Sequence, residues 1–308
     1  MADPIGIGIV GVGKIVRDQH LPALAADPGY RLVAAASRHG KVDGIPNFAT
    51  IEAMLEAVPG LDAVCLCMPP QFRYDAARAA LEAGKHVFLE KPPGATVSEV
   101  EHLKALAAEK GLSLFASWHS RYAPAVEAAR TFLASARLRS AAIDWKEDVR
   151  RWHPNQDWIW MPGGFGVFDP GINALSIATH IFPAMRIVSA ELDFPGNREA
   201  PIAAHVAFRT ADGIAVRMEL DWRQTGPQSW DIAAETDRGS MLLSGGGARL
   251  AIDGKVVHEE REAEYPALYR RFAELVREGR SDADLAPLQH VADAFMLGRR
   301  NVVEAFHD

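Results

Sequence analysis

Residues 5–16 run Ile5-Gly6-Ile7-Gly8-Ile9-Val10-Gly11-Val12-Gly13-Lys14-Ile15-Val16, an apolar stretch that leads directly into two spaced glycines. The apolar half predicts a buried strand, and the residues beyond Gly13 predict a helix that extends to about Ala26. A glycine loop between a strand and a helix lets the backbone approach a pyrophosphate, and the helix N-terminus offers it free N–H groups. Val16 stands where the dinucleotide-binding motif has a third glycine or an alanine, so the loop alone is a weak signal. Because the loop heads a strand–helix–strand unit, we predict nucleotide binding, with cofactor contacts from Gly11, Gly13, Lys14 and Ile15.

Short apolar runs alternate with helical segments over the first 120 residues. Strands are predicted at Ile5–Val10, Arg31–Ala36, Leu61–Met68, Val87–Leu89 and Leu114–Ser117. One helix is predicted over Arg73–Ala83, and another opens with a capping box at Ser98-Glu99-Val100-Glu101 and ends at Gly111. This alternation predicts a doubly wound parallel sheet of the Rossmann type, whose ligands bind beyond the carboxyl ends of the strands.

The pattern changes near Arg137, where the apolar runs become longer and turn signals such as Asp212-Gly213 separate them. Strands are predicted at Ser140–Asp148, Arg186–Phe194, Ile202–Thr210, Ile214–Trp222 and Ile232–Glu235, and closing helices at Tyr265–Glu278 and Leu288–Phe306. We therefore predict an α/β protein of two domains. Residues 1–120 form an NAD(P)-binding Rossmann domain, and residues 121–308 form a substrate-binding and oligomerisation α+β domain with an open, mostly antiparallel sheet.

Composition excludes several classes of partner. The formal net charge of −7 over 308 residues argues against nucleic acid, whose binders usually carry a basic face. The two cysteines, Cys65 and Cys67, lie two apart in an apolar run, which predicts packing against one face of a strand rather than a disulfide or a metal clip. We find neither a secretion signal nor an apolar run long enough for a membrane helix, and expect a cytoplasmic protein.

The end of the second predicted strand carries Ser37-Arg38-His39 and no acidic residue. An Asp or Glu at this point usually bonds the ribose 2′-hydroxyl of NAD. A hydroxyl and a guanidinium suit the 2′-phosphate of NADP instead, and the arginine can also stack on adenine. We predict NADP as the cofactor, contacted by Ser37 and Arg38, with NAD also accepted. The alternative is that these side chains are only solvated loop residues.

Glu90-Lys91-Pro92 follows the fourth predicted strand, at the ligand edge of the sheet. A lysine there is a candidate acid/base or hydroxyl-orienting group, although a lone lysine after a strand is more often simply solvated. Together with the Gly11/Gly13 loop and Pro69-Pro70, this motif resembles the glucose–fructose oxidoreductase and inositol dehydrogenase family. The resemblance covers the whole chain. It implies that Lys91 lies beside the reacting carbon, that Pro69, Pro70, Glu90 and Lys91 join the cofactor site, and that the Lys91–Pro92 peptide is cis.

A second part of the sequence resembles one group of enzymes within that family. The stretch from Trp145 to Pro154, the glycines near residue 164 and the run Asp169-Pro170-Gly171-Ile172-Asn173 are similar to the aldose 1-dehydrogenases of that family. Such enzymes oxidise the anomeric hydroxyl of a pyranose to a lactone. Many family members carry a histidine base at the position of Asn173. An amide cannot take up and release a proton in that way, so the task moves to Asp169 or Lys91.

The residues themselves support chemistry around Asp169. As an N-cap ahead of Pro170 its role would be structural. A helix starting there, however, places Asp169, Asn173, Ile177 and Ile181 on one face, a polar pair at the head of an apolar stripe. We take Lys91, Asp169 and Asn173 as the catalytic candidates.

Aromatic and polar side chains crowd the stretch around residues 145–160. Trp152, in a predicted loop, can offer an indole face to sugar C–H groups, while Glu147 and His153 bond hydroxyls. His119, after the fifth strand, is a weaker candidate for the substrate site. The histidines show no metal-ligand spacing, and we predict no metal.

These observations predict an NAD(P)-dependent dehydrogenase that oxidises L-arabinose or D-galactose, with D-fucose as a related substrate, at the anomeric carbon. The alternatives are an oxidoreductase acting on another sugar or cyclitol hydroxyl, and a non-catalytic sensor that binds NAD(P) or a sugar. We expect a small aldose as the substrate and, from the family resemblance, association of identical subunits through the open sheet.

Overall fold

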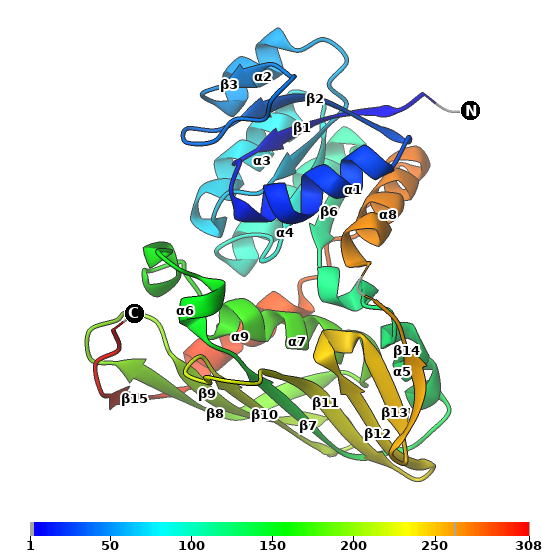
Figure 1. The fold of residues 1–308 in the computed structure, drawn as a ribbon, viewed down its shortest axis with the longest axis vertical. Helices are drawn as coiled ribbons and strands as arrows, with labels where there is room; N and C mark the ends of the chain where they lie inside the picture. The colour runs from blue at the N-terminus through cyan, green and yellow to red at the C-terminus, as the bar shows by residue number, and fades with distance from the viewer. Residues whose placement is uncertain (1–2, 262, 308) are drawn as a thin grey trace. The chain divides into compact units, whose positions relative to one another are not determined.

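The structure is a computed structural model that describes residues 3–261 and 263–307 (Figure 1). The chain divides into two compact units, one of Met1–His119 with Tyr265–Leu285 and the other of Ser120–Glu264 with Ala286–Asp308. The domain boundary expected after residue 120 lies within one residue of the boundary observed between His119 and Ser120. The segment 265–285, which we predicted in the second domain, belongs instead to the first unit. Its helix α8 (Glu264–Glu278) packs Tyr269 against Phe88, with ring centroids 5.3 Å apart.

The first unit is built on a six-stranded parallel sheet in the order β3-β2-β1-β4-β5-β6. Its strands are β1 (Ile5–Val10), β2 (Tyr30–Ala36), β3 (Asn47–Phe48), β4 (Ala63–Leu66), β5 (His86–Glu90) and β6 (Leu114–Ser117). Every residue of β1 is buried, as a central strand with helices on both faces requires. The strand order reverses direction at β1, which places the ligand crevice beyond the carboxyl ends of β1 and β4. The predicted Rossmann sheet is confirmed, and the short strand β3 is an addition to it.

Four further helices belong to this unit: α1 (Leu21–Ala26), α2 (Ile51–Ala57), α3 (Arg73–Glu82) and α4 (Val97–Lys110). The predicted capping box of α4 is displaced by two residues. Thr96 is the N-cap, since its side chain accepts from the Glu99 N–H at 3.2 Å and the Glu99 carboxylate accepts from the Thr96 N–H at 3.2 Å. Ser98 cannot cap, because it already lies in the first helical turn. Gly111 ends the helix in the left-handed conformation, as predicted.

The second unit holds a nine-stranded sheet in the order β14-β13-β12-β11-β7-β10-β9-β8-β15. Its strands are β7 (Leu138–Lys146), β8 (Met185–Pro195), β9 (Ala203–Thr210), β10 (Ala215–Asp221), β11 (Ser229–Thr236), β12 (Gly239–Ser244), β13 (Arg249–Ile252), β14 (Lys255–Glu259) and β15 (Arg299–Val303). Neighbouring strands are antiparallel except for β7 with β10 and β8 with β15. The predicted meander is therefore present in two runs, β8–β10 and β11–β14, and β7 lies between them.

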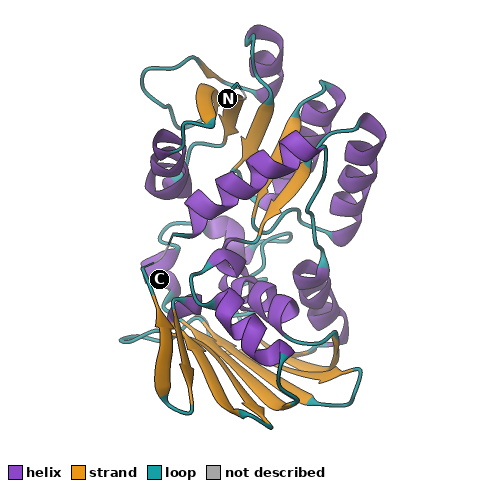
Figure 2. Ribbon diagram, turned by 90° about the vertical axis from the view of Figure 1, so that its right-hand side faces the viewer, coloured by secondary structure: helices purple, strands orange, loops and turns teal. Residues whose placement is uncertain are grey.

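Helices cover one face of this sheet and leave the other open (Figure 2). They are α5 (Val126–Ala134), α6 (Val149–Trp152), α7 (Phe168–Ile181) and α9 (Ala286–Leu297). The predicted helix Leu288–Phe306 is wrong in its second half, since α9 ends at Leu297 and residues 299–303 form β15. The chain turns at Gly298, where a Cβ atom would collide with the Ala294 carbonyl oxygen and lie 2.8 Å from a Leu192 methyl group. Among the residues described here, no helix is both long and apolar enough to cross a membrane.

The cap of α4 gives a test of this part of the fold. We expect Thr96→Ala to lower the free energy of unfolding by about 1 kcal/mol, because the Glu99 N–H loses its acceptor. Ser98→Ala should change it by less than about 0.5 kcal/mol, as is usual for a surface position. Urea denaturation followed by circular dichroism measures both. A larger loss for Ser98→Ala than for Thr96→Ala would return the cap to the position first predicted.

Candidate functional site

A cavity of about 580 Å³ lies at the carboxyl ends of β1, β2 and β4 in the first unit. Of the predicted cofactor contacts it is lined by Gly11, Gly13, Ser37, Arg38 and Pro69. Lys14, Ile15, Pro70, Glu90 and Lys91 are absent from its lining; the Lys14 ammonium pairs with the Asp18 carboxylate instead. Residues that sequence reasoning missed also line it: Thr50, Glu52, Cys67 and Phe72. Thr50 and Glu52 lie at the start of α2, and Cys67 and Phe72 lie on either side of Pro69-Pro70 after β4.

The backbone conformation of the loop that lines this cavity requires a glycine at position 11. Its φ of +86° is a conformation that L side chains rarely adopt, and a Cβ atom would lie 2.7 Å from the Met68 backbone nitrogen. A Cβ atom at Gly13 would meet open space, so the second glycine keeps the loop surface bare rather than relieving a clash. A bare backbone facing a cavity is what a pyrophosphate needs, and these residues therefore fit a dinucleotide.

The segment after β2 is folded back on itself. The Ser37 hydroxyl accepts from the Gly40 N–H at 3.2 Å. The Arg38 guanidinium lies 5.8 Å from the centroid of the Phe72 ring, and both line the cavity. Glu52, an acid on another element, lines the same cavity. The guanidinium and the carboxylate give this cavity groups that can distinguish a phosphate from a hydroxyl.

Glu90, predicted as a cofactor contact, is instead a buried acceptor for its neighbours, with 3% of its surface exposed. One carboxylate oxygen, Oε2, accepts from the Lys91 backbone N–H at 2.7 Å. The other, Oε1, accepts from the Tyr265 hydroxyl at 2.8 Å and lies 3.1 Å from Nε2 of His20. The Lys91–Pro92 peptide is cis, as the resemblance implied. The carboxylate therefore fixes the backbone that carries Lys91.

The surroundings of His20 and Glu90 shift the pKa of each side chain towards its charged form. Burial lowers the pKa of His20, but Cys67 and Glu90 outweigh it and raise that pKa to about 10. Burial likewise raises the pKa of Glu90, but the positive charge and hydrogen bond of His20 outweigh it and lower that pKa to about 2. An imidazolium beside a carboxylate in a buried site is stable only because each has its partner.

The thiols of Cys65 and Cys67 lie beside the same imidazole. Their sulfur atoms are 3.4 Å apart and each is 3.6 Å from a nitrogen of His20, so the predicted packing on one side of the strand is confirmed. The three ligand atoms lie within 4.8 Å of one another, close enough to surround an ion. Both nitrogens of His20 already have partners, however, Tyr269 at 2.7 Å and Glu90 at 3.1 Å. The absence of a metal stays a prediction.

In the second unit, Asp169 is the second residue of α7 and not its N-cap. The helix begins at Phe168, two residues before the predicted start, with Val167 at the N-cap and no capping side chain, so the predicted cap is wrong. Asp169 is 3% exposed, and its Oδ2 atom lies 3.4 Å from Nε2 of His153. Asn173 follows one turn later on the same face and is half-buried, with Ile177 buried beyond it. The structure thus joins three predicted site residues, His153, Asp169 and Asn173, in one neighbourhood.

Glu147 and the tryptophans form the other side of this neighbourhood. The buried Glu147 carboxylate accepts from the indole N–H of Trp222 at 3.3 Å and of Trp230 at 2.9 Å. Trp222 in turn packs on His153, with ring centroids 5.3 Å apart. Trp152 is 38% exposed, which leaves indole surface available, and the Arg151 guanidinium lies 4.8 Å from its ring centroid. Trp222 and Trp230 were missed because each lies in or next to a strand, where a tryptophan is usually core.

His119 directly follows Trp118 at the end of the first unit and stacks on Tyr265, with ring centroids 5.8 Å apart and planes at 23°. This contact gives the ring a structural neighbour in the same unit. A role for His119 in binding substrate stays a prediction.

Comparison with known proteins agrees with this arrangement. The profile of the GFO_IDH_MocA group, described as "Oxidoreductase family, NAD-binding Rossmann fold", matches residues 5–117. A galactose 1-dehydrogenase from Pseudomonas fluorescens is 46% identical over 307 residues, which is 99% of each chain. A crystal structure of a D-galactose-1-dehydrogenase protein from Rhizobium etli shares 66% identity with a TM-score of 0.96, covering 100% of this chain and 99% of that one.

A structure of much lower sequence identity shares the same fold. A 3-ketoreductase from Actinomadura kijaniata is 20% identical with a TM-score of 0.83, covering 97% of this chain and 99% of its own. At that identity the likeness concerns the fold alone. The full-length match at 46% identity carries the assignment, and the resemblance found in the sequence is confirmed. The chain belongs to the Gfo/Idh/MocA family of oxidoreductases with an NAD-binding Rossmann fold.

Proposed function

We propose that this chain is an NAD(P)-dependent aldose 1-dehydrogenase that oxidises the anomeric hydroxyl of D-galactose and L-arabinose, and also of D-fucose, to the lactone. The observation that carries the proposal is the full-length identity of 66% with a D-galactose-1-dehydrogenase protein. The side chains to which we assign the proton transfer support it, since Lys91 follows β5 and the buried Asp169 lies beside His153.

The three sugars are chemically close. L-arabinopyranose and D-galactopyranose share their ring configuration and differ in the exocyclic carbon. Loss of such a substituent changes binding by only about 1–3 kcal/mol. A site that recognises ring hydroxyls through His153 and Asn173 should therefore accept both, with the indole of Trp152 against the C–H face of the ring.

The reaction removes a hydride and a proton from the anomeric centre. The bound cofactor supplies the acceptor for the hydride, at C4 of its nicotinamide. The proton of the C1 hydroxyl passes to Asp169 or to Lys91, and a carbonyl forms at C1. Asn173 accepts or donates hydrogen bonds but cannot carry this proton. We assign it to orienting the sugar.

Kinetics with purified enzyme test the proposal. We expect reduced cofactor to accumulate at 340 nm with D-galactose and L-arabinose but not with myo-inositol. Lys91→Ala and Asp169→Asn should each lower kcat by about 10²–10⁴, the usual contribution of acid–base catalysis. A near-normal rate in either variant would remove that residue from the reaction. Binding of NADP without turnover of any aldose would favour the sensor alternative.

We further propose NADP as the preferred cofactor, with NAD accepted, on the strength of Arg38 in the nucleotide cavity. Removal of a charged phosphate contact costs about 1.5–3 kcal/mol. Arg38→Ala should therefore raise KM for NADP by about tenfold to a hundredfold and leave KM for NAD within about threefold. Arg78→Ala is the matched control, because Arg78 lies on α3, pairs with Glu82 and is absent from the cavity lining. Equal effects of Arg38→Ala on both cofactors would refute the assignment.

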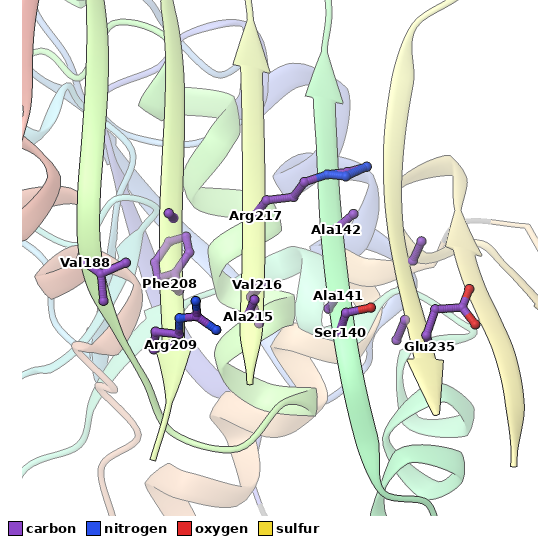
Figure 3. A pocket seen from close by; sticks show the side chains of 13 residues that line it. Ser140, Ala141, Ala142, Val188, Phe208, Arg209, Ala215, Val216, Arg217 and Glu235 are labelled. Carbon is purple, nitrogen blue, oxygen red and sulfur yellow. The ribbon is translucent and has the colours of Figure 1, made fainter. Parts of the chain in front are cut away.

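The open face of the second unit's sheet supports a proposal about assembly. It carries a shallow cavity of about 450 Å³, with alanines such as Ala142 and Ala215 on its floor (Figure 3). Arg209 and Arg217 lie on neighbouring strands, and Glu235 lies at the far side. A face with small residues at its centre and both signs of charge around them suits a second copy across a two-fold axis. We propose a cytoplasmic homo-oligomer formed through this face.

Light scattering coupled to size-exclusion chromatography tests the assembly. The wild-type chain should elute as an oligomer, and Ala142→Arg, which places a long cation on the floor of the face, should shift it to the monomer. Ala83→Arg, at an exposed position after α3, should leave the mass unchanged. A monomeric wild type, or an Ala142→Arg variant that stays oligomeric, would contradict the proposal.

A further inference from the structure

Helix α8 contributes two tyrosines to a buried polar cluster around Glu90 and His20. Tyr265 and Tyr269 are one helical turn apart, and both are 5% exposed or less. The Tyr265 hydroxyl donates to Oε1 of Glu90 across 175 positions of sequence. The Tyr269 hydroxyl lies 2.7 Å from Nδ1 of His20. A helix that the sequence placed outside this unit thus contacts both members of the buried ion pair.

The contacts of the cluster lead from Tyr269 through His20 to Glu90. His20 lies between the Tyr269 hydroxyl and the Glu90 carboxylate, with Nδ1 toward Tyr269 and Nε2 toward Oε1 of Glu90. The Tyr265 ring packs edge-on against the His20 ring, with centroids 4.9 Å apart. Oε1 therefore receives two donors from different elements, and the carboxylate cannot rotate without breaking both hydrogen bonds. Its second oxygen, Oε2, is left aimed at the Lys91 N–H, 2.7 Å away.

The far side of the turn is held as well. The Arg73 guanidinium bonds the backbone carbonyls of Glu90 and Pro92, and its Nε donates to the Met68 carbonyl at 2.8 Å. The Glu90–Lys91 peptide group is therefore held at both ends, its N–H by the Glu90 carboxylate and its carbonyl by the Arg73 guanidinium. Only the carboxylate side runs through α8.

We infer that Tyr265 and His20 are positioning residues for Lys91, which they hold through the Glu90 carboxylate. The inference rests on the proposed function in taking Lys91 as a group that acts on the substrate. Tyr265 contacts no reacting atom in this scheme. Its hydroxyl keeps Glu90 in the rotamer that accepts from the Lys91 N–H, and a small shift of that backbone moves the lysine ammonium by a comparable distance. Misplacement by about 1 Å can cost about a hundredfold in rate.

The cluster also explains why a carboxylate, rather than an amide, stands before Lys91. Burial of an unpaired carboxylate is costly, and here the cost is met by the His20 imidazolium, a tyrosine hydroxyl and a backbone N–H. An amide at position 90 would place N–H hydrogens at one of these contacts and turn a donor–acceptor pair into two donors. We therefore expect Glu90→Gln to disturb the same link that Tyr265→Phe removes.

The test compares Tyr265→Phe with a matched control in the full-length enzyme. Tyr30→Phe also deletes one buried tyrosine hydroxyl that bonds α8, since the Tyr30 hydroxyl donates to the Tyr269 carbonyl at 2.6 Å, but it does not touch Glu90. We expect Tyr265→Phe to lower kcat about tenfold with KM for cofactor within about twofold. Tyr30→Phe should leave kcat within about twofold even where its melting temperature falls as far.

Backbone hydrogen exchange supplies a readout that does not need turnover. The Lys91 amide should exchange at least about tenfold faster in Tyr265→Phe than in wild type, and at the wild-type rate in Tyr30→Phe. Glu90→Gln should reproduce the faster exchange, and the double variant should be no worse than the poorer single one, as expected for one shared path.

The outcomes separate this inference from the proposed function. If the wild type oxidises no aldose, the dehydrogenase proposal fails and the exchange rates still decide whether Tyr265 holds the Lys91 turn. Unchanged exchange at Lys91 in Tyr265→Phe would overturn the inference. So would losses of kcat that are equal in Tyr265→Phe and Tyr30→Phe, because a general loosening of α8 would then account for both.

Discussion

One buried carboxylate, that of Glu90, determines how several distant segments pack in the first unit. Glu90 ends β5 inside the protein, where it must find donors for both oxygens or be neutralised. The donors come from three places in the chain: the segment before α1, the neighbouring peptide and helix α8. Satisfying Glu90 therefore requires α8 to return to this unit, although strands β7 to β14 of the second sheet precede it in sequence.

This constraint explains where sequence-based inference succeeded and where it could not. The strands β1, β5 and β6 follow from continuous apolar runs, and Gly11 follows from a loop with a known purpose. Such local signals survive folding because both faces of a parallel sheet are covered. The place of α8 depends instead on Tyr265 meeting a residue 175 positions away, and amphipathic periodicity predicts a helix without saying what it packs against.

The same limit applies to the second unit. The capping pattern at Asp169-Pro170 predicted a helix start correctly to within two residues, but assigned the carboxylate to the backbone. In the structure the Asp169 side chain turns to His153, because the helix begins earlier and its first turn no longer needs that oxygen as a cap. The strand β15 was not predicted, for a different reason. Gly298 breaks a run whose apolar residues suit a helix on one side and a sheet edge on the other.

Glu90 and Glu147 show that a carboxylate near a candidate site need not face a ligand. Each was predicted to bind one, Glu90 the cofactor and Glu147 the sugar. In the structure each accepts from aromatic donors brought by distant segments, Tyr265 for Glu90 and the indoles of Trp222 and Trp230 for Glu147. Aromatic side chains suit this task, since one polar atom satisfies the carboxylate while the ring fills the surrounding apolar space. The carboxylate in turn fixes its neighbour, the Lys91 backbone in one unit and the Trp222 ring beside His153 in the other. In both units the acid therefore holds in place the groups proposed to meet the sugar.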